Sequence, residues 1–223
     1  MAKNTSASRE RRERAQQLAL AQKKKERIIL ISAIAALVVI IAVATIIIIM
    51  NLPKDETTNT VCINVTHTDA NGKKHTGDII VELDPENAPI TVANFKKLVS
   101  EGFYDGLVFH RIIEGFMIQG GGFDTSMNEK DADTIKGEFS ANGVDNGIKH
   151  VRGTISMART SVYNSASSQF FIVHQDSVYL DGQYSSFGYT VYGMDVVDEI
   201  ASIPTDYSDR PKIAVRIKKV TII

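Results

Sequence analysis

Two kinds of hydrophobic pattern divide this chain. Residues 28–50 contain no charged side chain and consist mostly of Ile, Val and Ala. At about 1.5 Å per residue, a helix of this length crosses the roughly 30 Å hydrocarbon core of a bilayer. From Val61 onward, short segments instead alternate apolar and polar residues, as strands with one buried face do. The pattern therefore predicts one transmembrane helix followed by a globular domain.

The globular part is predicted to contain eight short strands and two helices. Asn71-Gly72 is a strong hairpin signal between the first two strands. A helix is expected from Pro89 to a stop at Gly102, and a second over Met194–Ala201. Many short strands with two helices favour a closed β-barrel over a layered α/β fold. The strands are expected at residues 61–68, 78–83, 107–113, 116–120, 153–158, 169–174, 186–192 and 213–223.

Charge around the apolar segment predicts its orientation. Residues 1–27 carry a net charge of +6, whereas the whole chain carries −1, and only Lys54 lies close to the other end of the segment. The positive-inside rule keeps the N-terminus in the cytoplasm and places residues 51–223 on the far side. The basic tail has no aromatic residue to stack on bases, so no nucleic-acid partner is expected.

The apolar segment is expected to be an uncleaved anchor. It is longer than the apolar region of a typical signal peptide, and no small-x-small cleavage site follows it. The predicted organisation is a basic cytoplasmic tail (1–27), a transmembrane signal-anchor helix (28–50), a linker (51–60) and one domain (61–223). Cys62 is the only cysteine, so the chain forms no internal disulfide.

The segment Phe109–Phe123 contains the most distinctive chemistry. It places Arg111 in an apolar, strand-like run and ends in three glycines. Arginine is seldom buried without a partner, so Arg111 is either held in a structural ion pair or directed at a ligand. Alternation predicts that Arg111 shares a strand face with Phe109 and Ile113. It likewise predicts that Met117 and Gln119 share a face.

This segment resembles the signature of the cyclophilins, the peptidyl-prolyl cis–trans isomerases built on a closed eight-stranded barrel. Residues 167–172 (SSQFFI) and residues 179–182 (YLDG), followed by Phe187-Gly188, resemble other pocket walls of that family, in the same order. The resemblance implies a mainly β fold: a closed, antiparallel, cyclophilin-like barrel with two capping helices. Residues 158–160 (ART) and 165–168 (SASS) are similar to bacterial members.

The resemblance also implies a role for each matching residue. Arg111 matches the catalytic arginine, and Gln119 matches the amide that binds the substrate backbone. The pocket for the proline ring corresponds to Phe116, Met117, Phe171 and Leu180. The groove for flanking residues corresponds to His110, Ala158, Arg159, Gln169, Tyr179 and Tyr184.

Three of these positions depart from the family pattern. Tyr179 stands where many eukaryotic members carry Trp, and Tyr184 where they carry His. Cyclosporin binding in the family depends on that indole, so weak binding at most is expected. Arg159 replaces a small polar residue and is expected to favour acidic flanking residues in the substrate.

Rotation about an X-Pro bond needs no nucleophile, base, metal or cofactor. Its barrier of roughly 18–20 kcal/mol comes from resonance between the amide nitrogen and the carbonyl. A donor that holds the nitrogen lone pair out of resonance stabilises the twisted state. The five histidines (67, 75, 110, 150 and 174) show no metal-ligand spacing along the chain, so no metal site is expected.

The sequence therefore predicts an isomerase that acts on proline-containing exported or membrane proteins outside the cytoplasm. The alternative is a non-catalytic, membrane-tethered proline-peptide binding module or holdase. A third hypothesis is a structural anchor with an inactive domain. The set of Arg111, Phe116 and Gln119 favours the enzyme, because peptide binding alone would not require the arginine.

Overall fold

The computed structural model describes residues 58–69 and 72–223. The predicted cytoplasmic tail, the predicted transmembrane helix and most of the predicted linker lie outside these residues. Among the described residues, none of the helices has both the length and the apolar composition needed to cross a bilayer.

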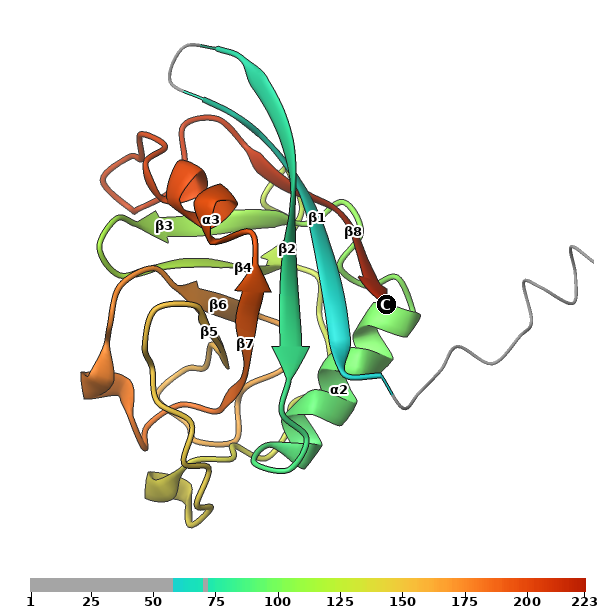
Figure 1. Ribbon diagram of the computed structural model, residues 1–223, viewed down its shortest axis with the longest axis vertical. Helices are drawn as coiled ribbons and strands as arrows, with labels where there is room; N and C mark the ends of the chain where they lie inside the picture. The colour runs from blue at the N-terminus through green and yellow to red at the C-terminus, as the bar shows by residue number, and fades with distance from the viewer. Residues whose placement is uncertain (1–57, 70–71) are drawn as a thin grey trace, which may run out of the picture. The chain divides into compact units, whose positions relative to one another are not determined.

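Eight antiparallel strands close into a barrel (Figure 1). Their order around the barrel is β1-β2-β7-β5-β6-β4-β3-β8, and β8 pairs with β1 to complete it. The strands are β1 Thr60–Thr68, β2 Lys74–Leu83, β3 Val108–Ile113, β4 Met117–Phe123, β5 Thr154–Met157, β6 Phe170–Val173, β7 Ser186–Tyr192 and β8 Val215–Ile222. The helices are α2 Pro89–Ser100 and α3 Met194–Ala201, with short 3-10 turns η1 Ser140–Asn142 and η2 Val178–Leu180.

The predicted barrel and both predicted helices are confirmed, although some strand ends differ. β2 begins four residues earlier than expected, because its pairing with β1 continues as far as Thr68 and Lys74. β4 extends through the three glycines to Phe123, which pairs with Val108 of β3. β8 begins at Val215 and not at Ile213.

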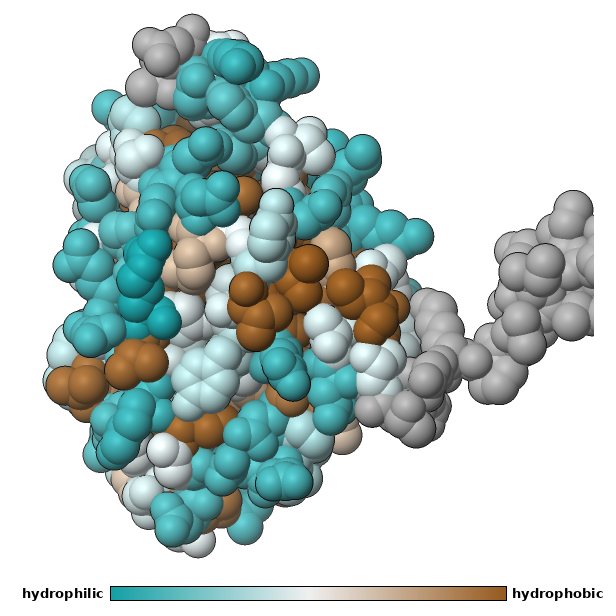
Figure 2. Space-filling view, viewed as in Figure 1, coloured by the Kyte–Doolittle hydropathy of each residue, from teal (hydrophilic) through white to brown (hydrophobic). Residues whose placement is uncertain are grey.

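The barrel interior is filled by aliphatic and aromatic side chains. Phe95 of α2 is fully buried, and its ring lies 5.1 Å from the rings of both Tyr104 and Phe187. Val197 and Ile200 of α3 belong to the same core. The face of the molecule shown in Figure 2 is correspondingly hydrophilic over most of its area, with separate small hydrophobic patches.

The N-terminus of α2 is held by a distant carboxylate. Ala88 precedes the helix and provides no side-chain cap. Glu138 instead accepts hydrogen bonds from the backbone N–H of Ile90, at 3.0 Å, and of Thr91, at 2.7 Å. It also accepts one from the Thr91 hydroxyl, at 2.6 Å. A buried acceptor thereby satisfies N–H groups that have no partner inside the helix.

A β-bulge overturns one prediction about strand faces. Phe109 pairs with Gly120 and Arg111 pairs with Gln119, so His110 is an extra residue on β3. Phe109 therefore lies in the barrel core, together with Ile112. Arg111 lies on the opposite side and does not share a face with Phe109. The expectation was wrong because strict alternation does not continue through a bulge.

Candidate active site

A cavity of about 300 Å³ lies on the side of β3, β4 and β6 that faces away from the barrel core. All of its lining residues belong to the predicted substrate site. They are Arg111, Phe116, Met117, Gln119, Ala158, Arg159, Phe171, Leu180 and Tyr184. His110, Gln169 and Tyr179 complete the predicted set but do not line this cavity.

The floor of the cavity is apolar. Met117 and Phe171 are almost completely buried and form a cluster with Val173 and Leu180 that is separate from the barrel core. Strand pairing brings these positions together, because Met117 lies opposite Val173 across β4 and β6. η2 supplies Leu180. This dry surface matches the chemistry of a proline ring.

Arg111 lies at the edge of this floor. Its Nε donates a hydrogen bond to Oδ2 of Asp209 at 3.2 Å, and each of these two side chains is 41% exposed. Guanidinium has five N–H donors in a planar fork. The Asp209 contact uses only Nε, so the two terminal amino groups can donate to a bound molecule. Gln119 lies directly across the strand pair from Arg111.

Two residues outside the cavity lining hold Gln119. Its Nε2 donates to Oε1 of Gln169 at 3.0 Å and lies 3.5 Å from Nε2 of His110. Burial, together with the charges of Arg111 and Arg210, lowers the pKa of His110 to about 4. The imidazole is therefore neutral near pH 7 and adds no second cation beside Arg111.

Arg159 forms part of the cavity wall. Its Nε and Nη2 donate to the Gln183 carbonyl, at 3.0 and 2.8 Å, and its Nη1 donates to the Thr160 carbonyl. The guanidinium also lies 4.6 Å from the centre of the Tyr184 ring. Arg159 therefore fixes the position of Tyr184 through stacking, in addition to contributing positive charge. Sequence reasoning expected only the charge.

Tyr179 lies at the open side of the site. Its side chain is largely exposed, and its ring centre is 5.9 Å from that of Phe116. A ligand that rests on Phe116 would therefore lie beside this ring, although Tyr179 does not line the cavity.

Sequence reasoning missed two residues that position the site. Asp209 orients Arg111, as described above. His174 accepts a hydrogen bond at Nδ1 from the backbone N–H of Gly115, at 2.9 Å, and its Nε2 lies 3.2 Å from Asp198. It thereby holds the turn that carries Phe116. Asp209 is far along the chain from Arg111, and His174 is far along the chain from Gly115. No sequence motif connects the members of either pair.

The backbone at the three glycines passes close to neighbouring segments. Gly121 has φ of +84°, and a Cβ there would lie 2.9 Å from the Ser168 carbonyl oxygen. A Cβ on Gly122 would lie 2.5 Å from Cγ of Gln169. The absence of side chains therefore lets β4 approach the segment that carries Gln169.

A larger hollow of about 670 Å³ lies along α2. Its lining includes Pro89, Val92, Lys96 and Glu101. Its lining contains lysines but no arginine, and no aromatic side chain. It therefore lacks the arginine donor and the buried aromatic floor that the smaller cavity has. The smaller cavity is therefore the better candidate for isomerisation.

Comparison with known proteins agrees with this geometry. Residues 65–222 match the family model described as "Cyclophilin type peptidyl-prolyl cis-trans isomerase/CLD". The chain is 43% identical over 157 residues to peptidyl-prolyl cis-trans isomerase A of Dickeya dadantii, covering 66% of this chain and 80% of that protein. It is also 43% identical over 159 residues to peptidyl-prolyl cis-trans isomerase B of Escherichia coli, covering 66% of this chain and 94% of that protein.

A solved structure shares the fold. The crystal structure of a cyclophilin type peptidyl-prolyl cis-trans isomerase from Cryptosporidium parvum superposes with a TM-score of 0.62 at 28% identity, and covers 74% of this chain and 98% of that chain. The matched family, the relatives and the cavity lead to one conclusion. The chain belongs to the cyclophilin-type peptidyl-prolyl cis–trans isomerase family and is an enzyme of that class.

Proposed function

We propose that this protein is anchored in a membrane and isomerises X-Pro bonds in exported proteins as they fold on the outer side. The observation that supports the catalytic part is a fixed arginine donor, Arg111, beside a buried apolar floor. The apolar segment at residues 28–50 and the basic tail before it support the anchor. The bacterial relatives named above support a bacterial source.

Arg111 supplies the donor that the reaction requires. As the X-Pro bond twists, the nitrogen loses resonance with the carbonyl and its lone pair becomes available to a donor. A terminal amino group of Arg111 donates to that lone pair in the twisted state and not in the planar ground state. Such a contact accelerates the reaction because it is stronger in the transition state than in the bound substrate.

The other lining residues hold the proline in place. Met117, Phe171 and Leu180 enclose the ring in a water-poor surface, which keeps the nitrogen near Arg111. Gln119 is the polar group that binds the flanking backbone. The Cryptosporidium parvum relative was also solved in the presence of the dipeptide Ala-Pro, with a TM-score of 0.59 and 29% identity.

The activity is tested with the full chain in detergent micelles and an Ala-Pro peptide whose cis-to-trans rate is measured. We expect fast exchange, and Arg111→Ala lowers kcat/KM by about 10²–10³-fold, as the loss of one transition-state donor does in other enzymes. Arg216→Ala is the matched control, because Arg216 is an exposed arginine on the neighbouring strand β8. Bound peptide without acceleration would instead establish the non-catalytic binding module or holdase.

The orientation is tested by labelling cysteines in intact cells with a membrane-impermeant maleimide. Cys62→Ser removes the native thiol. Tyr207→Cys then introduces a thiol at a fully exposed position of the domain, and Ser8→Cys introduces one in the basic tail. We expect labelling at position 207 in intact cells and labelling at position 8 only after lysis. The reverse pattern, or protein that is not retained in the membrane fraction, contradicts the proposal.

A further inference from the structure

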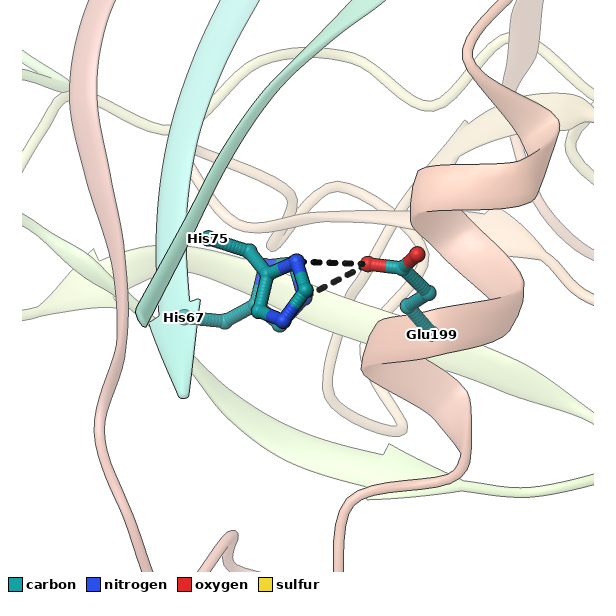
Figure 3. A group of neighbouring side chains, drawn as sticks. All are labelled: His67, His75 and Glu199. Atoms are coloured by element: carbon teal, nitrogen blue, oxygen red, sulfur yellow. Dashed lines mark hydrogen bonds and ion pairs between the residues drawn. The ribbon is translucent and has the colours of Figure 1, made fainter. Parts of the chain in front are cut away.

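A second group of ligand-type side chains lies outside the catalytic cavity. The rings of His67 and His75 stack on each other, and both present a nitrogen to the Glu199 carboxylate (Figure 3). Nε2 of His67 lies 3.0 Å from Oε2 of Glu199, and Nδ1 of His75 lies 3.8 Å from the same oxygen. One ligand atom from each residue falls within 4.8 Å of the others.

The barrel brings the two histidines together although a hairpin turn separates them along the chain. His67 of β1 and His75 of β2 are directly opposite each other in the strand register. Directly opposed side chains in an antiparallel pair have neighbouring Cβ atoms. Their rings lie 5.3 Å apart at an interplanar angle of 15°. The sequence expectation of no metal site considered only spacing along the chain and could not register this pair.

Close packing of α3 on β2 places the Glu199 carboxylate beside the two histidines. A Cβ on Gly77 would lie 2.6 Å from a methyl group of Val196, so only glycine allows the helix to approach this closely. His75 is two residues before Gly77 and lies on the same strand face. Glu199 is three residues after Val196 and lies on the same helix face. Glu199 is therefore directed toward His75 and its strand partner.

Asp69 orients the ring of His75. Its Oδ2 lies 3.0 Å from Nε2 of His75, so Nδ1 is the ring nitrogen that faces the Glu199 carboxylate. When the ring proton is on Nε2, the Nδ1 lone pair is available to a metal ion that also contacts the carboxylate. A carboxylate that orients a histidine in this way is the usual outer partner of a metal-bound imidazole.

His67 is the buried member of the group. It is 3% exposed, and its Nδ1 has no hydrogen-bond partner among the described residues. Its Nε2 is directed to the Glu199 carboxylate, so Nε2 is the nitrogen that would bind a metal ion, while Nδ1 would carry the ring proton.

We propose that His67, His75 and Glu199 bind one divalent transition-metal ion of the zinc class. Two imidazole nitrogens and one carboxylate oxygen form a common zinc ligand set, with water in the fourth position. Tetrahedral zinc with bonds of about 2.0–2.1 Å places its ligands about 3.3 Å apart. The two separations from Glu199, 3.0 and 3.8 Å, lie on either side of that value. The two histidine nitrogens lie within 4.8 Å of each other, so binding requires a rotation of the stacked rings that brings both lone pairs toward the ion. Glu199 is 54% exposed, so solvent reaches the site and the side chain can adjust.

The bound ion would tie α3 to the β1–β2 hairpin, which makes it a structural site distinct from the catalytic cavity. The test uses the metal-stripped full chain without a polyhistidine tag, in detergent micelles, with zinc chloride as the probe. Zinc affinity is measured by competition with a chromogenic chelator, and stoichiometry by elemental analysis. Residues 1–57 contain no histidine or cysteine, so they offer no comparable ligand set.

We expect one zinc ion per chain. Both His75→Ala and Glu199→Gln weaken zinc binding at least tenfold. Asp195→Asn is the matched control, because it removes an exposed carboxylate from the same helix, and it changes the affinity by less than twofold. Zinc also raises the unfolding midpoint of the wild type and of Asp195→Asn, and not that of Glu199→Gln.

Glu199 is exposed, so Glu199→Gln provides the test even where His75→Ala does not fold. No stoichiometric zinc in the wild type would overturn the proposal. Equal affinity in the wild type and Glu199→Gln would overturn it as well, because the ion would then be bound elsewhere.

Discussion

Nε of Arg111 donates a hydrogen bond to Oδ2 of Asp209 at 3.2 Å, and the Asp209 carbonyl accepts one from the backbone N–H of Ile112 at 2.8 Å. Asp209 has φ of +62°, a left-handed conformation that few non-glycine residues adopt. The loop before β8 is thus attached to β3 at two points, the arginine side chain and the backbone N–H of the next residue. Arg111 is oriented before any substrate binds.

Asp209→Asn is expected to lower kcat/KM for an Ala-Pro peptide about three- to tenfold. Asparagine tolerates the left-handed backbone, so the loop keeps its path, while the charged partner of Arg111 is lost. Because both side chains are half-exposed, the free energy of unfolding should change by less than about 1 kcal/mol. Asp133→Asn, at an exposed position outside the cavity lining, is the control. Equal activity in both variants would show that Asp209 does not position Arg111.

The lowered pKa of His110 makes folding stability depend on pH. Burial lowers this pKa from 6.5 to about 4, so the unfolded chain binds a proton at a higher pH than the folded chain does. The corresponding stability is fully present above about pH 6.5 and is lost as the pH falls toward about 4. The loss between about pH 7 and about pH 4.5 should amount to roughly 2–3 kcal/mol.

Urea unfolding at these two pH values tests this expectation in the wild type and in His110→Gln. The variant should lose less stability on acidification, by roughly the amount given above. His150, whose pKa burial also lowers, remains in both proteins and contributes equally to both slopes. Identical slopes would mean that His110 titrates normally in the folded protein.

Glu138→Gln should destabilise the fold by about 2 kcal/mol. The carboxylate accepts three hydrogen bonds at the start of α2, and an amide replaces one acceptor oxygen with a donor that faces other donors. Chemical denaturation would measure the change. Glu86→Gln, at an exposed position shortly before the helix, should change stability by less than about 0.5 kcal/mol. A similar small effect in Glu138→Gln would show that the helix start does not depend on this contact.

Tyr179→Trp should tighten cyclosporin binding at least tenfold. Tyr179 is exposed beside Phe116, in the position where the family resemblance places an indole. Indole adds apolar area and a donor N–H that phenol lacks. Calorimetry on the wild type and the variant gives the affinities. Tyr192→Trp adds the same indole at an exposed position at the end of β7, outside the cavity lining, and should leave the weak binding unchanged, so an equal gain in both variants would indicate nonspecific adsorption.

Local sequence determined most of the barrel. Alternation over Val61–Thr68 predicts β1, and Pro89 with Gly102 predicts the limits of α2, because these signals depend on residues close together along the chain. The residues that line the cavity were predicted through their resemblance to the family, in blocks of consecutive residues. The anchor at residues 28–50 and the roles of individual site residues stay predictions.

Tertiary structure alone decided three other features. The bulge at His110 moved Arg111 away from the face of Phe109, because the pairing partner on β4 and not the strand itself sets the register. Asp209 contacts Arg111 only because the loop before β8 packs against β3. Strand register placed His67 beside His75, and helix packing placed Glu199 next to both. Each feature depends on contacts between residues that are far apart or differently paired along the chain, which a pattern in one dimension does not record.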